Sequence, residues 1–181
     1  MQVDLYSEAE IAKGCQQNDR FFQEILYRRY ARKMYGICLS YAGNRSLAQD
    51  MLHEAFMKIY KGIGDFRASG SLEGWVRRTV THTAIDHLRQ TKRMESFIDD
   101  KQEVPETAAE ASALDMLGAK DILKQVARLP AGARVIFNLF ALEGYTHKEI
   151  ALELNISEGT SKSQYNRART LLMSWIKDAN T

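Results

Sequence analysis

The side chains best suited to chemistry form a polar and basic run near the end of the chain. Their hydroxyl, amide, ammonium and guanidinium groups are donors that suit phosphate oxygens and base edges in a major groove. The candidate residues are Thr160, Ser161, Lys162, Ser163, Gln164, Asn166, Arg167 and Arg169. Just before them, Ile150, Ala151, Leu154 and Ile156 are spaced to pack two short helices at a steep angle. Residues 146–169 therefore predict a helix-turn-helix, although a plain helical hairpin with a solvated charged side fits the same pattern.

Two more groups of polar residues stand in the first half of the chain. Asp50 and Glu54 are one helical turn apart, so they project from one face and could pair with arginines of a partner; a solvated acidic face is the alternative. Arg77, Arg78 and Arg89 could hold the phosphates of a nucleic acid. Phe66 and Trp75 could stack on bases, although a tryptophan on an apolar stripe is more often part of a core.

Apolar residues at three- and four-residue steps predict the helices that position these groups. In the first half the pattern predicts helices over residues 19–42, from a cap at Ser46 to about 62, and from 72 to 88, with a polar loop at 65–71. In the second half it predicts helices over 117–129 and 135–142, closed by Pro130 and Gly144. A capping box at Thr146 and Glu149 opens a helix to Leu154, and the last helix runs over about 158–177.

The distribution of charge divides the chain. Residues 74–93 carry five basic residues against one acidic, whereas residues 95–115 carry one basic residue against seven acidic. The acidic stretch contains Pro105 and no sustained apolar stripe, which is typical of a flexible linker. We therefore predict an all-α protein with an N-terminal domain at 1–93, a linker at 94–113 and a C-terminal helix-turn-helix domain at 114–181.

Several classes of function are disfavoured by the residues themselves. The four histidines, His53, His82, His87 and His147, lack metal-ligand spacing, and no phosphate loop, nucleophile elbow or pair of catalytic carboxylates is present. We therefore expect neither catalysis nor a metal or other cofactor. The N-terminus lacks the features of a signal sequence, and no window approaches the roughly 20 apolar residues of a membrane span. We expect a cytoplasmic protein with no stable membrane insertion.

Motifs in the last third of the chain resemble the promoter-binding domain of extracytoplasmic-function (ECF) sigma factors, a group of the sigma-70 family. The matching segments are 129–130, 135–137, 143–151, 156–160, 162–163 and 167–169. In that family the domain reads the minus-thirty-five element of a promoter. The resemblance implies that Lys162, Ser163, Asn166 and Arg167 face DNA. Ser161 and Gln164 depart from the Val and Arg that many members carry.

The first half resembles the same family independently. Residues 48–56 are similar to the helix that docks on the clamp-helix coiled coil of the largest polymerase subunit, and residues 65–93 resemble the region that recognises the minus-ten element. The implied polymerase contacts are Asp50, His53, Glu54 and Phe56. The implied minus-ten contacts are Phe66, Arg67, Arg77, Arg78, His82 and Arg89. The loop at 66–73 is then the candidate pocket for a base that leaves the stack.

The resemblance implies a sigma factor that binds core RNA polymerase, recognises promoter DNA and initiates transcription without catalysing a reaction. It also implies an anti-sigma factor as a partner, because an inhibitor would cover the polymerase-docking faces. We expect a monomer when the protein is free. The alternative is a conventional helix-turn-helix regulator whose N-terminal helices sense a signal or dimerise; such a protein binds duplex DNA alone and starts no transcripts.

Overall fold

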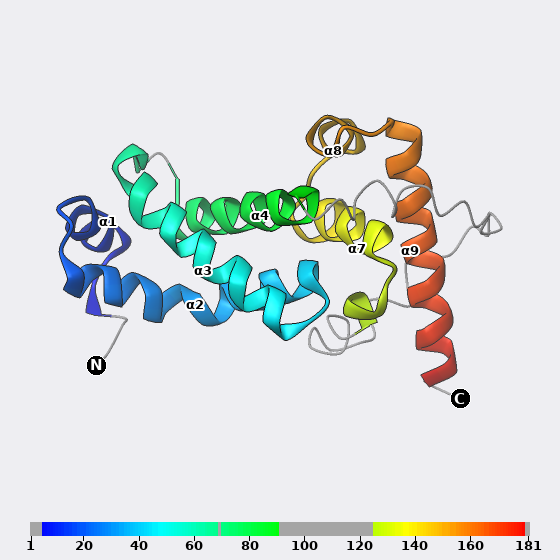
Figure 1. Cartoon of the computed structure of the whole chain (residues 1–181), viewed down its shortest axis with the longest axis horizontal. Coiled ribbons are helices and arrows are strands. Elements are labelled where there is room, and N and C mark those ends of the chain that lie inside the picture. Colours follow the sequence, from blue (N-terminus) through cyan, green and yellow to red (C-terminus); the bar gives the residue numbers. More distant parts are fainter. Residues whose placement is uncertain (1–4, 69, 91–124, 180–181) are drawn as a thin grey trace. The chain divides into compact units, whose positions relative to one another are not determined.

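Helices make up all the regular secondary structure in the part of the chain that the structure describes. The computed structural model describes residues 5–68, 70–90 and 125–179. The chain divides into two compact units, Met1–Gln90 (unit 1) and Thr91–Thr181 (unit 2) (Figure 1). The predicted all-α fold is confirmed. The predicted linker and most of the helix predicted at 117–129 lie outside the described residues.

Unit 1 is built on three long helices that pack against one another, with a fourth, shorter helix at one end (Figure 1). The long helices are α2 (Arg20–Ala42), α3 (Arg45–Gly62) and α4 (Leu72–Gln90), and the short one is α1 (Glu8–Gln16). Their apolar stripes meet in a core that includes Ile25, Leu26, Met34, Met51, Ile59, Val80 and Ile85. Burial of these faces holds the surface residues of α3 and α4 in fixed positions.

Local capping sets where the helices of unit 1 begin and end. The Asp19 carboxylate accepts a hydrogen bond from the Phe21 backbone at 2.9 Å and caps α2, which ends at Gly43 in the left-handed region. The cap of α3 is Asn44, whose Oδ1 accepts from the Leu47 backbone at 2.9 Å. The prediction of Ser46 as this cap is wrong, because the helix has already begun one residue earlier.

Unit 2 contains α7 (Ala131–Phe137), a π-helical turn labelled η4 (Asn138–Leu142), α8 (His147–Leu154) and α9 (Glu158–Ala179). The predicted capping box is confirmed: Thr146 Oγ1 accepts from the Glu149 backbone, and the Glu149 carboxylate accepts from the Thr146 backbone at 2.8 Å. Asn155, with φ of 52°, makes the turn between α8 and α9. A core cluster of Val126, Leu129, Ala133, Phe137, Ala168 and Leu172 joins α7 to α9.

Arg134 is a buried cation that closes the helix before Pro130. Its Nη1 donates to the carbonyl oxygens of Ala127 at 3.0 Å and Leu129 at 3.3 Å, at the end of helical residues 125–128. Carbonyl groups in a last helical turn lack partners within the helix, so a guanidinium stabilises them. Burial lowers the pKa of Arg134. The role of this basic residue is therefore structural and internal to unit 2.

Helix α1 was not among the predicted elements. It packs on α2 through Ile11, Ala12 and Cys15, which are almost completely buried. Gly14 allows this close approach, because a Cβ built there would lie 2.1 Å from Cδ2 of Phe22. The Phe22 ring has little room to move, since the rings of Tyr6 and Phe21 contact it edge-on with centroids 5.3 and 5.4 Å away.

A pair of glycine substitutions tests this contact. Gly14→Ala is expected to destabilise unit 1 by about 1–3 kcal/mol, because the added methyl overlaps the Phe22 ring. Gly36→Ala is the control: it lies inside α2, and a Cβ there meets no atom within 4 Å. It should stabilise the helix by roughly 0.5–1 kcal/mol. Thermal unfolding followed by circular dichroism measures both, and equal stability of the two variants would contradict the close packing.

Candidate nucleic-acid and polymerase-binding surfaces

One edge of α3 carries the residues predicted to bind polymerase. Asp50 and His53 are exposed. Met57 is 45% exposed and follows them at the spacing that keeps residues on one helical face. Tyr27 of α2 is also 45% exposed, and its ring centroid lies 4.7 Å from that of Phe56. Sequence reasoning missed Met57 and Tyr27, although the seven-residue step from Asp50 to Met57 was a usable signal.

Phe56 does not belong to this surface. Only 3% of it is exposed, because its ring is packed between Tyr27 and Tyr60, whose ring centroids lie 4.7 and 6.0 Å away. The structure therefore places this predicted contact residue in the core of unit 1. The family pattern marks the position but does not tell a core residue from a contact residue.

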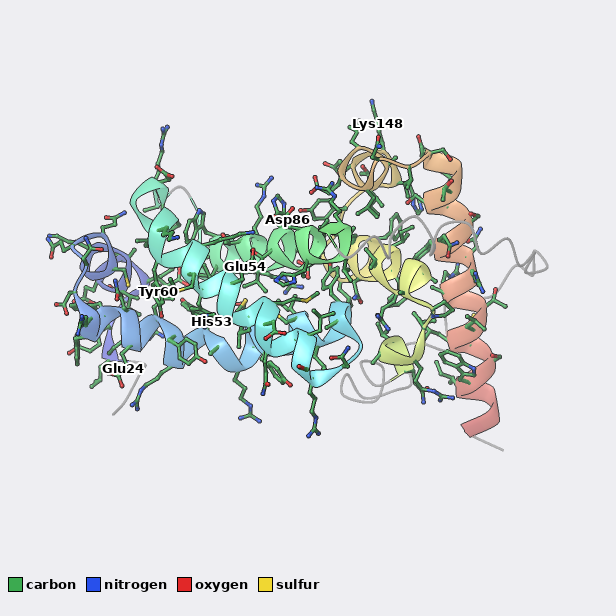
Figure 2. All side chains as sticks on the ribbon, viewed as in Figure 1. Glu24, His53, Glu54, Tyr60, Asp86 and Lys148 are labelled. Atoms are coloured by element: carbon green, nitrogen blue, oxygen red, sulfur yellow. The ribbon has the colours of Figure 1, made fainter. Side chains whose placement is uncertain are left out.

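Glu54 is held inside the protein's own charge network at the contact of α3 with α4 (Figure 2). Its carboxylate lies 2.9 Å from Lys58 Nζ and 2.5 Å from His87 Nε2, and Lys58 also reaches Asp86 at 3.1 Å. The hydrogen bond from Lys58 is the main cause that lowers the pKa of Glu54. Burial would lower the pKa of Lys58, but its bonds to Glu54 and Asp86 outweigh burial and raise it. Glu54 therefore positions α4 while its half-exposed carboxylate stays at the surface.

The residues predicted to contact the minus-ten element lie on α4 and, for Phe66 and Arg67, on the segment between α3 and α4. The Phe66 ring is half-buried against Trp75, with centroids 5.8 Å apart, and Arg67 is exposed. Along α4 the spacing places Arg78, His82 and Arg89 within about 40° of one another around the helix axis. Arg78 is exposed, His82 is half-buried, and the side chain of Arg89 is 41% exposed and lies 3.8 Å from Asp86.

Arg77 stands apart from that face. It is half-buried and lies about 100° around the helix from Arg78. The structure therefore brings together Arg78, His82 and Arg89 and leaves Arg77 to one side. Trp75 is also only half-buried, so its ring is neither sealed in the core nor fully open to solvent.

Helix α9 of unit 2 has one polar face that is open and another that is buried. Lys162, Ser163 and Asn166 are exposed, and Thr160 and Arg169 are partly exposed. Lys162 Nζ lies 2.7 Å from the Glu158 carboxylate, one turn earlier. These exposed groups leave hydroxyl, ammonium and amide donors on the surface of the second helix of a helix-turn-helix.

Three of the predicted DNA contacts on α9 face inward instead. Ser161 is fully buried, and only 6% of Gln164 and 9% of Arg167 are exposed. The structure therefore buries these three predicted contacts instead of exposing them to a ligand. The spacing of Ser161 and Gln164 places them on the same side of α9 as the core residues Ala168 and Leu172, whereas Arg167 lies about 100° around the helix from Ala168, at the edge of that side.

Ser161 instead joins the two helices of the motif. Its Oγ lies 2.9 Å from Nδ1 of His147, the first residue of α8. The His147 ring stacks on Phe140, with centroids 4.3 Å apart and planes 16° apart. Burial lowers the pKa of His147 and the charge of Lys162 lowers it further, while Glu158 acts in the opposite direction. The imidazole is therefore neutral at neutral pH. Its hydrogen bond to Ser161 joins α8 to α9 while its ring stacks on Phe140.

Comparison with known families accounts for both units. Sigma-70 region 2 matches residues 26–94, and Sigma-70 region 4 matches residues 119–172. The chain belongs to the sigma-70 family. These two matches cover the surfaces on α3, α4 and α9 and leave α1 outside.

The relatives of this sigma factor include several that are named ECF RNA polymerase sigma factors. The ECF RNA polymerase sigma factor SigM of Mycobacterium tuberculosis is 27% identical over 97% of this chain and 87% of its own length. The RNA polymerase sigma-H factor of Pseudomonas aeruginosa is 25% identical, with 90% of each chain covered. The chain is an ECF sigma factor.

Two solved structures share the fold of this sigma factor. The sigma factor RpoE of Bartonella quintana, in complex with the anti-sigma factor NepR, is 21% identical with a TM-score of 0.50, over 87% of this chain and 96% of that one. CnrH, in complex with the cytosolic domain of CnrY, is 18% identical with a TM-score of 0.50, over 96% of this chain and 99% of that one. Within the described residues, no helix is long and apolar enough to span a bilayer.

Two substitutions on α3 separate core from surface. Phe56→Ala should lower the free energy of unfolding by about 3–5 kcal/mol, because it removes a ring packed between two tyrosines. His53→Ala, one turn earlier at an exposed position, should change it by less than about 0.5 kcal/mol. Chemical denaturation measures both values. A Phe56→Ala variant as stable as the wild type would show that this ring is not part of the core.

Proposed function

We propose that this ECF sigma factor binds core RNA polymerase, directs it to promoter DNA and starts transcription there, and that an anti-sigma factor holds it inactive. The observation that carries the proposal is the presence of region 2 and region 4 in one chain. Either helical unit alone is compatible with many DNA-binding proteins. Their combination in one chain matches a protein that binds two promoter elements.

In this proposal the exposed edge of α3 is the polymerase-docking surface. We define this surface as Asp50, His53 and Met57, with Tyr27 of α2 beside it. It combines a carboxylate with apolar groups, and interfaces of this kind bury an apolar centre and pair charges around it. Glu54 contributes through its half-exposed carboxylate. An anti-sigma factor that covers this surface would block polymerase binding, which is the physical basis of the proposed inhibition.

The DNA contacts are divided between the units. In unit 1, the proposed contacts to the minus-ten element are Phe66, Arg67, Arg78, His82 and Arg89. A base that leaves the stack would be accepted near Phe66. In unit 2, the proposed contacts to the minus-thirty-five element are Thr160, Lys162, Ser163, Asn166 and Arg169. Their hydrogen-bond donors suit phosphate oxygens and base edges.

We further propose that the protein acts in the cytoplasm, where polymerase and DNA are, and is a monomer when free. Its role in initiation requires binding and strand separation, and the polymerase performs the chemistry. No cofactor is needed for these steps. The free energy that separates the strands comes from the contacts that the opened strand makes with the protein.

The decisive experiment is transcription with purified components. Core polymerase with this protein, on genomic DNA of the source organism, should produce transcripts whose 5′ ends fall at discrete sites that core alone ignores. Sequencing of those ends measures the effect. Identical 5′ ends with and without the protein, together with binding of the free protein to duplex DNA, would favour a conventional regulator.

Reversal of one charge tests the docking surface. Asp50→Arg should weaken core-polymerase binding roughly tenfold or more. The substitution replaces a carboxylate with a positive charge, which would repel the basic residues of the partner. Asp50 is exposed, so the free energy of unfolding should stay unchanged. Gln17→Arg introduces the same side chain at an exposed position after α1 and serves as the control. Equal affinities of the two variants for core polymerase would rule out this surface.

A further inference from the structure

Helix α1 lies outside the part of the chain that matches region 2, yet it contacts the segment that joins α3 to α4. We call the described part of this segment the connector; it comprises the turn η2 (Ile63–Asp65) and residues 66–68 and 70–71. In Figure 1, α1 stands at the end of unit 1 where α3 finishes. The proposed function places the acceptance of an unstacked base at this connector, so the groups that fix its position matter.

One end of the connector is fixed by Gln16. Its Nε2 donates to the carbonyl oxygen of Ile63 at 3.1 Å and to that of Phe66 at 3.2 Å. Phe66 is the residue whose ring packs against Trp75. A single amide group therefore ties the start of the connector to the last residue of α1 and fixes the backbone that carries the Phe66 ring.

The other end is fixed by Glu8. Its Oε2 accepts from the Leu72 backbone at 2.7 Å, and its Oε1 accepts from the Glu73 backbone at 3.2 Å and from the Tyr30 hydroxyl at 2.9 Å. Burial tends to raise the pKa of Glu8, but the bonds from Leu72, Tyr30 and Glu73 outweigh burial and lower it. The carboxylate is therefore charged at neutral pH and caps α4 from another helix.

The two ties do not serve the packing of α1. That packing comes from Ile11, Ala12 and Cys15, whereas Gln16 is exposed and uses its amide on the connector backbone. Gln17, its neighbour, is equally exposed, and no side-chain hydrogen bond joins it to the other described residues. The Gln16 side chain contributes nothing to the core and donates to the carbonyl oxygens of both Ile63 and Phe66. It is therefore suited to positioning the connector backbone.

We propose that α1 contributes to recognition of the minus-ten element. In this proposal Gln16 and Glu8 are positioning residues that hold the two ends of the connector in place for the incoming base. Neither residue needs to touch DNA. They reduce the conformational freedom that the connector would otherwise lose when a base binds, so strand opening costs less free energy. The inference rests on the proposed function, because it assigns α1 to the same site.

Gln16→Glu tests the first tie, because it keeps the size of the side chain and replaces the donor with a carboxylate that repels both carbonyl groups. Gln17→Glu introduces the same charge one residue away and is the matched control. Holoenzymes are assembled from core polymerase and each full-length variant. Permanganate reactivity of unpaired thymines then measures strand opening on a promoter that the wild-type protein uses. Core affinity and unfolding temperature are measured in parallel.

We expect Gln16→Glu to slow strand opening roughly three- to tenfold, the effect of losing two hydrogen bonds at a partly exposed site. Core affinity should remain within about twofold of the Gln17→Glu control. Equal opening by the two variants would overturn the inference and leave the proposed function intact. A parallel loss of opening, core affinity and unfolding temperature would assign Gln16 a general folding role and also overturn it. Failure of the wild-type holoenzyme to open any promoter would overturn the proposed function itself.

A second arm examines Glu8 in the free protein. Glu8→Gln keeps the shape of the side chain but replaces the carboxylate with a neutral amide, which has one oxygen to accept hydrogen bonds from the Leu72 and Glu73 backbone instead of two. Hydrogen exchange of these two amides should accelerate, while the amides in the middle of α2 keep their protection. Unchanged exchange at Leu72 and Glu73 would contradict the role of Glu8 at this end of the connector.

Discussion

The first turn of α4 presents backbone N–H groups that its own helix cannot satisfy, and unit 1 is organised so that each one has an acceptor. Glu8 accepts from Leu72 and Glu73, the Ser71 hydroxyl accepts from Gly74 at 3.0 Å, and the Ser71 carbonyl accepts from Trp75 at 3.2 Å. Two of these four acceptors come from a helix more than 60 residues earlier in the sequence. The start of α4 therefore depends on a long-range contact with α1.

A second set of contacts, between α3 and the last turns of α4, joins two surfaces that have different partners in the proposed function. Glu54 lies beside the polymerase-docking surface. Its ion pair with Lys58 lies within α3, and its contact with His87 connects α3 to α4. Lys58 bonds Asp86 in turn, and Asp86 lies within 3.8 Å of Arg89 on the proposed DNA face. A partner that binds the Glu54 carboxylate competes with Lys58 and His87 for it. Polymerase binding and the charge on the DNA face of α4 are thus linked through three successive ion pairs.

Local features of the sequence were sufficient to predict most helices, because capping and apolar periodicity act over a few residues. The Thr146 capping box and the end of α3 near Gly62 are examples. The side of α9 that Gln164 faces was not predicted, because the type of a side chain does not reveal which face meets α7 or α8. Helix α1 was missed although Ser7 and Glu10 form the same kind of capping box that marked α8; its contacts with distant backbone groups could not be predicted from local pattern. The burial of Phe56 was not predicted, because it depends on Tyr27 of another helix.

The Glu8 cap also determines which part of a nucleic acid can approach the start of α4. An uncapped helix N-terminus attracts anions, since its free N–H groups and the helix dipole both favour negative charge. Here a protein carboxylate already fills that position. A sugar-phosphate backbone would meet electrostatic repulsion at this point, whereas a flat, uncharged heterocycle would not. In the proposed function, this carboxylate would favour the approach of a neutral base toward Phe66 and Trp75 over the approach of a phosphate.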